Sequence, residues 1–105
     1  MGHDLSATRY PIKASIRFRI KGQFEWREGT TVNISRSGVL FLSCIDLPPE
    51  TIIVMKIMLP FELLDKSATI VCCWGQVVRK DAVLTEKCDC PVLAAAILRY
   101  RFSDD

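Results

Sequence analysis

The chain of 105 residues is long enough for one hydrophobic core and too short for two, so we expect a single domain over residues 1–105. Half of the residues are hydrophobic and 25% are charged, a balance that is typical of globular proteins and excludes a disordered chain. The formal net charge of +2 excludes the strong basic excess of proteins that bind nucleic acid mainly through its phosphates. We therefore expect no DNA partner, and any basic site must be local.

No segment is expected to cross a membrane or to direct secretion. The longest apolar stretch, residues 51–61, is interrupted by Lys56 and Pro60 and is far shorter than the roughly 20 apolar residues of a membrane-spanning helix. The amino terminus lacks a basic segment that is followed by an apolar run and a small-residue cleavage site. We therefore expect a cytoplasmic protein without a membrane span.

The five cysteines are expected to be reduced thiols, most of them buried, as is usual in a cytoplasmic chain. Cys88 and Cys90 are separated by one residue, which is closer than the usual spacing in a zinc half-site, and no second half-site follows. Cys72 and Cys73 are adjacent and would point to opposite faces of a strand. We expect no metal site and no redox role.

Hydrophobic alternation predicts a chain made of strands. Residues 1–8 lack this periodicity and are expected to form a flexible arm, after which Pro11 favours an extended entry to the first strand. In that strand Ile16, Phe18 and Ile20 alternate with polar residues, which is typical of a half-buried antiparallel strand. Six strands are predicted, at residues 15–20, 24–35, 37–42, 51–59, 68–80 and 91–102.

The connections between these strands are short, and two glycines interrupt the pattern. Gly29 is expected to form a bulge or bend in the second strand, and Gly75 a bend in the fifth. Residues 60–66 are expected to be a loop, and residues 81–91 a polar hairpin connection. Six short strands of this kind predict an all-β fold, a small antiparallel barrel, because closure of the sheet removes its exposed edges.

A polar motif stands where the second strand ends. Alternation would place Thr31, Asn33 and Ser35 on one face and Val32 and Ile34 on the other, just before a turn at residues 36–38. An amide beside a hydroxyl could bind the edge of a base, and Gly38 would allow positive φ or the close approach of a flat ligand. The alternative is a β-turn in which these polar side chains only hydrogen-bond the turn backbone.

The residues Asn33-Ile34-Ser35-Arg36-Ser37-Gly38 resemble the (Asp/Asn)-x-Ser-x-x-Gly signature of PilZ domains, which are bacterial receptors for cyclic di-GMP. The basic entry at residues 9–12, the first strand and residues 75–79 follow in PilZ-like order, so the resemblance covers nearly the whole chain. It implies a six-stranded barrel that binds cyclic di-GMP, uses no cofactor and is not an enzyme. PilZ domains often carry a helix after the last strand. Here the chain ends at Asp105, so we expect no long C-terminal helix and an exposed apolar face that binds a protein partner or a second copy.

The resemblance also implies a ligand site, but an incomplete one. PilZ domains carry an Arg-x-x-x-Arg motif before the first strand. With Arg9 as its second arginine the first position holds Leu5, and with Arg9 as the first arginine the second position holds Lys13. Residues 10–12 favour the former alignment. Arg36 in the turn adds a nearby cation. The implied site consists of Arg9, Lys13, Asn33, Ser35, Arg36 and Gly38, with weak binding because one arginine is missing.

Other interpretations are open at this point. The barrel could be a degenerate PilZ-type adaptor that binds protein and not cyclic di-GMP, and Arg9 and Lys13 could be a solvated basic entry to a strand. A barrel that stacks oligonucleotide bases on Phe18, Phe24 and Trp26 is a further alternative, although such aromatic residues usually fill a core. We expect no enzymatic activity, because the sequence has no Cys–His pair with a third group, no recognisable carboxylate pair and no phosphate-binding glycine loop.

Overall fold

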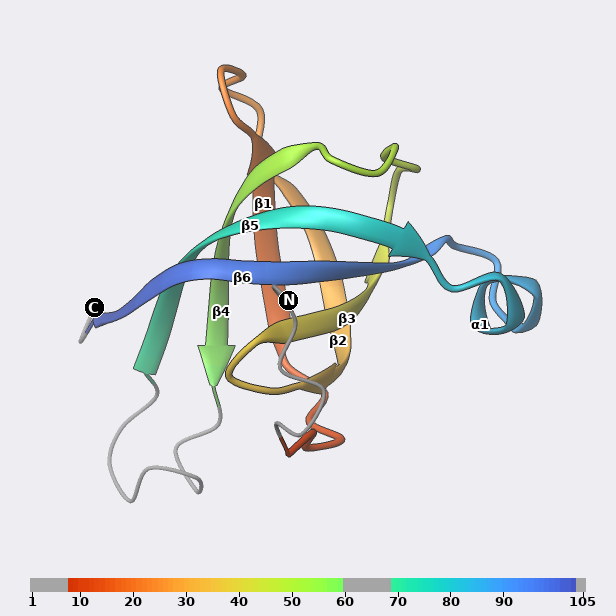
Figure 1. Ribbon diagram of the computed structural model, residues 1–105, viewed down its shortest axis with the longest axis horizontal. Coiled ribbons are helices and arrows are strands. Elements are labelled where there is room, and N and C mark those ends of the chain that lie inside the picture. Colours follow the sequence, from red (N-terminus) through yellow and green to blue (C-terminus); the bar gives the residue numbers. More distant parts are fainter. Residues whose placement is uncertain (1–7, 60–68, 104–105) are drawn as a thin grey trace.

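Antiparallel strands close into a barrel in this computed structural model, which describes residues 8–59 and 69–103 (Figure 1). The strands neighbour one another in the order β1-β2-β3-β6-β5-β4. The elements are β1 (Ser15–Ile20), β2 (Arg27–Ile34), β3 (Gly38–Ser43), β4 (Ile52–Leu59), β5 (Thr69–Lys80), α1 (Ala82–Lys87) and β6 (Val92–Ser103). The predicted six-stranded antiparallel barrel is confirmed. Within the described residues no helix follows β6.

The inward-facing side chains of the strands fill the barrel. On β1, Ile16 and Phe18 are fully buried whereas Ser15 and Arg17 are exposed, as the alternation predicts. The Phe18 ring packs against that of Phe41 on β3, with 5.3 Å between ring centroids. Other fully buried core side chains are Ile53, Met55, Val77 and Leu93. Because the core takes every second residue, the alternate residues face outward and are free to form binding surfaces.

The predicted bulge at Gly29 is wrong. The pairing of β2 with β1 and β3 is regular through Gly29, and the register shifts instead between Thr31 and Asn33. Gly29 is needed for another reason, because a Cβ there would collide with the backbone carbonyl oxygen of Leu42. The glycine therefore allows β2 and β3 to approach closely and does not break the strand.

Thr31 pairs with the buried Phe41 and faces into the barrel, where it is 1% exposed. The register shift after Thr31 puts Asn33 on the other face, so the predicted common face of Thr31 and Asn33 is also wrong. The Thr31 hydroxyl accepts a hydrogen bond from the backbone N–H of Ala14 at 2.8 Å and donates one to the carbonyl of Ile12 at 2.6 Å. Asn33 pairs with Leu40, which is 6% exposed but lines the outer hollow and is absent from the inner core cluster, so Asn33 faces outward. A buried threonine thus holds the segment that leads into β1.

The connection from β5 to β6 contains the helix α1, which the sequence analysis missed. Asp81 caps it, since its side chain accepts a hydrogen bond from the backbone N–H of Leu84 at 2.9 Å. The predicted bend of β5 at Gly75 is confirmed by a register shift between Trp74 and Gly75. A second shift follows between Val77 and Arg79. These shifts let the long strands β5 and β6 curve around the barrel, as Figure 1 shows.

The expectation that most cysteines are buried is wrong. All five are free, but Cys44, Cys88 and Cys90 are exposed and Cys72 is half-buried. Cys73 alone is buried, and burial, with a smaller contribution from Cys72, raises the pKa of its thiol to about 12. The described residues contain no group of His, Cys, Asp and Glu side chains that is placed to hold a metal ion.

Two predictions concern residues that the structure does not describe. They are the flexible arm, whose residues 1–7 lie outside the described ranges, and the loop at residues 60–66. The second strand begins at Arg27 and not at residue 24, so Phe24 lies in the connection between β1 and β2 and is 95% exposed. None of the helices formed by the described residues has the length and apolar character needed to cross a membrane.

Candidate functional site

The turn between β2 and β3 uses the Ser35 hydroxyl for its own backbone. The Ser35 oxygen accepts hydrogen bonds from the N–H groups of Ser37 at 3.2 Å and Gly38 at 3.1 Å. The Ser35 N–H donates to the Gly38 carbonyl at 2.9 Å. Ser35 therefore makes the backbone contacts of the turn alternative and shapes the turn.

Gly38 does not have positive φ, which among the described glycines only Gly22 adopts. A Cβ at Gly38 would lie 3.1 Å from the backbone carbonyl oxygen of Ala95, which is tighter than an ordinary contact. The close approach that the glycine permits is therefore to β6 of the same barrel. It also leaves the outer surface flat at this point.

The segment before β1 is fixed against the end of β2. Tyr10 and Ile34 exchange two backbone hydrogen bonds, of 2.8 Å and 2.9 Å. Further along, Ile12 and Ala14 are held by the buried Thr31 hydroxyl. These bonds place Arg9 beside the turn. Its side chain is exposed and has no hydrogen-bond or ion-pair partner among the residues that the structure describes.

Arg9 lines a shallow hollow of about 260 Å³ on the outside of the barrel. Small residues at outward positions form part of its floor, because Gly38 of β3 pairs with Ala96 of β6 and Ala94 lies two residues before Ala96. Leu40 and Val78 also line the hollow. Arg79 of β5 lies on the rim and makes a loose ion pair of 3.7 Å with Asp81. A flat floor between two guanidinium groups suits a planar, anionic ligand.

The structure brings together only part of the predicted site. Arg9 and Gly38 share the hollow, and Asn33 lies beside it as the outward-facing partner of Leu40. Lys13 is exposed and lies outside the hollow, and Arg36 lines a different cavity. Arg79 was not among the predicted site residues, although residues 75–79 follow the PilZ order.

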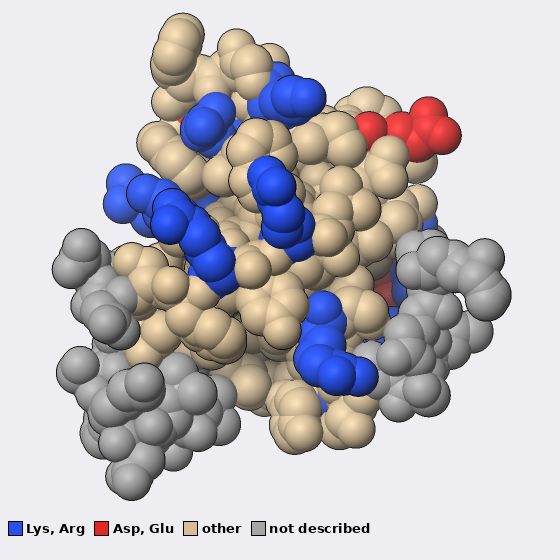
Figure 2. Space-filling model, turned by 60° about the vertical axis from the view of Figure 1, so that its left-hand side comes forward, with Lys and Arg blue, Asp and Glu red and all other residues tan. Residues whose placement is uncertain are grey.

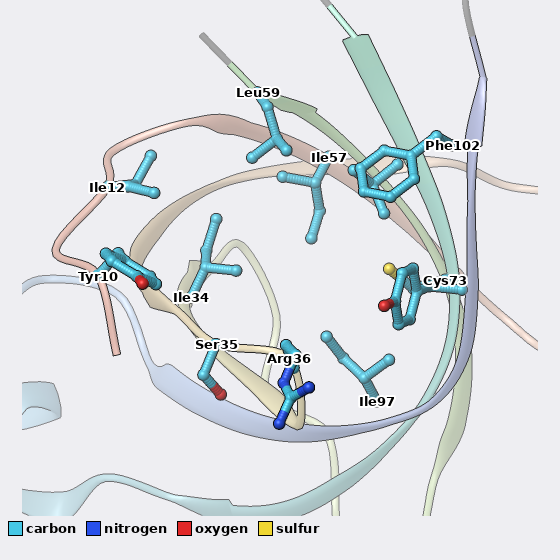
Figure 3. Close-up of a pocket in the computed structure, with 12 residues that line it drawn as sticks. Tyr10, Ile12, Ile34, Ser35, Arg36, Ile57, Leu59, Cys73, Ile97 and Phe102 are labelled. Carbon is cyan, nitrogen blue, oxygen red and sulfur yellow. The ribbon is translucent and has the colours of Figure 1, made fainter. Parts of the chain in front are cut away.

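That other cavity is the mouth of the barrel, of about 450 Å³ (Figure 3). Apolar side chains such as Ile34, Ile57 and Ile97 point into it, and Arg36 lies at its edge. Tyr100 and Phe102 of β6 line it and are 47% and 57% exposed, with 5.8 Å between their ring centroids.

No family model matches the sequence, and no curated protein matches it. Among solved structures, the chain is similar to the Bacillus subtilis inhibitor of motility MotI/DgrA, a PilZ-domain protein, with a TM-score of 0.76 and 14% sequence identity. The match covers 94% of this chain and 44% of that chain, so this chain spans less than half the length of its structural neighbour. At this level of identity the likeness shows the fold alone, and that fold is a PilZ-type barrel.

Proposed function

We propose that this domain is a PilZ-type sensor or adaptor that binds cyclic di-GMP weakly in the hollow beside Arg9 and has no catalytic activity. The proposal rests on the position of Arg9. This residue is held beside the turn, and its side chain has no partner among the described residues. It lines the hollow together with Gly38, Ala94 and Ala96. A guanidinium group can contact a phosphate or a guanine edge through two hydrogen bonds and can stack on a purine ring.

Weak binding is expected because the Arg-x-x-x-Arg motif has its first arginine at the position where this sequence has Leu5. A charge-assisted hydrogen bond contributes about 1.5 to 3 kcal/mol, so the loss of one such contact weakens binding by one to two powers of ten. Arg79 on the opposite rim of the hollow compensates part of this loss, since its side chain is 56% exposed and its ion pair with Asp81 is long. The solved structure of an inhibitor of motility with this fold supports a regulatory role over an enzymatic one.

The location of the site can be tested by heteronuclear NMR. Addition of cyclic di-GMP should shift the backbone amide signals of Gly38, Ala94 and Ala96, and the Arg9→Ala variant should lose these shifts. The amide signals of α1 are the internal reference, because its residues are not among those that line the hollow. Shifts that spare the three floor residues would contradict the proposed location.

A second candidate function is an adaptor that binds protein through the barrel mouth and does not respond to cyclic di-GMP. The exposed rings of Tyr100 and Phe102 favour it, because exposed apolar surface of this kind commonly marks a protein interface. Under this alternative the domain self-associates in sedimentation experiments, Phe102→Ser abolishes the association, and cyclic di-GMP has no effect on it. A monomer at high concentration would argue against self-association.

A further inference from the structure

The outside of the barrel carries a second cationic surface, on β1, β4, β5 and β6, which the proposed function does not use. Cross-strand pairing arranges its residues in two rows. One row consists of Arg17, Lys56, Cys72 and Arg101, and the next consists of Arg19, Val54, Trp74 and Arg99. We call the five cations of these rows, together with Trp26 and Trp74, the tryptophan face. Five of the 14 Lys and Arg residues of the chain therefore lie on one face.

This face has almost no compensating negative charge. The strands β1, β4, β5 and β6 contain no Asp or Glu at all. Glu28 of β2, which pairs with Arg17, stands at its margin. Figure 2, which looks at the left-hand side of Figure 1, shows Lys and Arg side chains spread over this side, with the prominent acidic side chains at the upper right edge. Like charges on neighbouring strands repel one another and destabilise the fold, so a bound anionic ligand would reduce this repulsion.

Both tryptophans of the chain belong to this face. Two cations contact the Trp26 ring, with 5.3 Å from its centroid to the guanidinium carbon of Arg19 and 5.0 Å to the Lys56 nitrogen. The guanidinium carbon of Arg99 lies 5.6 Å from the Trp74 centroid. The two rings and the cations line a shallow hollow of about 450 Å³, and Trp74 is 37% exposed. Flat rings interleaved with cations form a platform that can bind bases and phosphates together.

We propose that the tryptophan face binds single-stranded nucleic acid, with bases stacked on Trp26 and Trp74 and phosphates held by the flanking arginines and lysine. An acidic polypeptide would use the cations but would have no need of two indole rings. A duplex would present phosphates but keep its bases within the stack. The small net charge of the whole chain does not oppose this proposal, because the acidic residues are placed elsewhere and leave the face locally basic.

The test uses the tryptophans as reporters, because the chain has two and both lie on the face. Titration with a twelve-nucleotide oligo(dT) at low salt should quench the tryptophan fluorescence. The logarithm of the binding constant should fall with the logarithm of the salt concentration, with a slope of about −3.5 if five phosphates are contacted, since each contact contributes about −0.7 in single strands. Trp74→Leu should weaken binding about tenfold or more through the loss of stacking.

Charge-reversal variants test whether binding uses this face or another basic position on the protein. The double variant Arg99→Glu with Arg101→Glu should lose detectable binding, whereas Lys87→Ala, which removes an exposed cation at the end of α1, should leave the titration unchanged. Circular dichroism should confirm that each variant is folded. Absence of quenching at low salt, an unchanged titration in the double variant, or equally tight binding of poly-glutamate would each overturn the proposal. None of these outcomes depends on Arg9, so the proposal can fail or hold independently of cyclic di-GMP binding.

Discussion

Thr31 connects the core of the barrel to the candidate site through a single hydroxyl group. The side chain is 1% exposed and bonds the backbone of both Ile12 and Ala14, which precede β1. With the hydrogen bonds between Tyr10 and Ile34, it fixes the path of the segment that carries Arg9. The placement of Arg9 therefore depends on a buried residue that does not itself line the hollow.

Thr31→Val is the direct test of this role, because it keeps the shape of the side chain and removes the hydroxyl. The substitution leaves a backbone N–H and a carbonyl without their partner, which should lower the free energy of unfolding by about 1 to 3 kcal/mol. Thr30→Val is the matched control, since Thr30 is the exposed neighbour on the same strand and should change stability by less than about 0.5 kcal/mol. Urea unfolding followed by circular dichroism measures both. Equal effects of the two substitutions would contradict the structural role of Thr31.

At the scale of residues, turn chemistry could be anticipated from local sequence, whereas the face on which a strand residue lies could not. Serine commonly hydrogen-bonds the backbone of its own turn, and the Ser35 hydroxyl does so here. Such bonds were one of the two alternatives for this residue. Thr31 was assigned to the wrong face, because the register shift between Thr31 and Asn33 depends on how β2 meets β3. Such a shift leaves no local mark on the alternation of polar and apolar residues.

At the scale of elements, the close contact of β2 with β3 is set by one glycine. A Cβ at Gly29 would collide with the backbone carbonyl oxygen of Leu42, and backbone cannot move aside as a flexible side chain can. Gly29→Ala should therefore destabilise the barrel by about 3 kcal/mol, at the upper end of the cost of overpacking, and should separate the two strands. Native-state hydrogen exchange should show reduced protection along β2 and β3.

Gly22→Ala provides the comparison for this prediction. Gly22 has a φ of 90° and open space around its Cα, so alanine there causes backbone strain of about 1 to 2 kcal/mol without a collision. Protection of the β2–β3 amides should be retained in this variant. If the two variants had the same exchange pattern, the steric role of Gly29 would be wrong.

The elements differ in how well their sequences reveal them. All six strands were predictable because closure of the barrel gives each one a buried face and an outward face, and alternation encodes this directly. The helix α1 was not, because it buries no residue and so has no apolar periodicity. Its remaining signal is Asp81 at the cap, which a polar loop could equally contain.

At the scale of the whole molecule, the barrel carries distinct surfaces that sequence alone could reveal only in part. Arg9 was found because the resemblance to PilZ domains directs attention to the segment before β1. The tryptophan face was not, because its rows combine residues from Arg17 to Arg101 that become neighbours only when β1, β4, β5 and β6 pair. Surfaces assembled from four strands have no local motif, and the register of the closed sheet is needed to find them.

Isothermal titration of the domain with cyclic di-GMP tests the central proposal most directly. We expect weak but measurable binding by the wild type and none by Arg9→Ala. Leu5→Arg should tighten binding roughly tenfold or more, because it restores the family spacing to Arg9, although residue 5 lies outside the described residues. Lys13→Arg, at an exposed position outside the hollow, is the matched control and should change little. If the wild type binds nothing and neither Leu5→Arg nor Lys13→Arg creates binding, the barrel is not a cyclic di-GMP receptor.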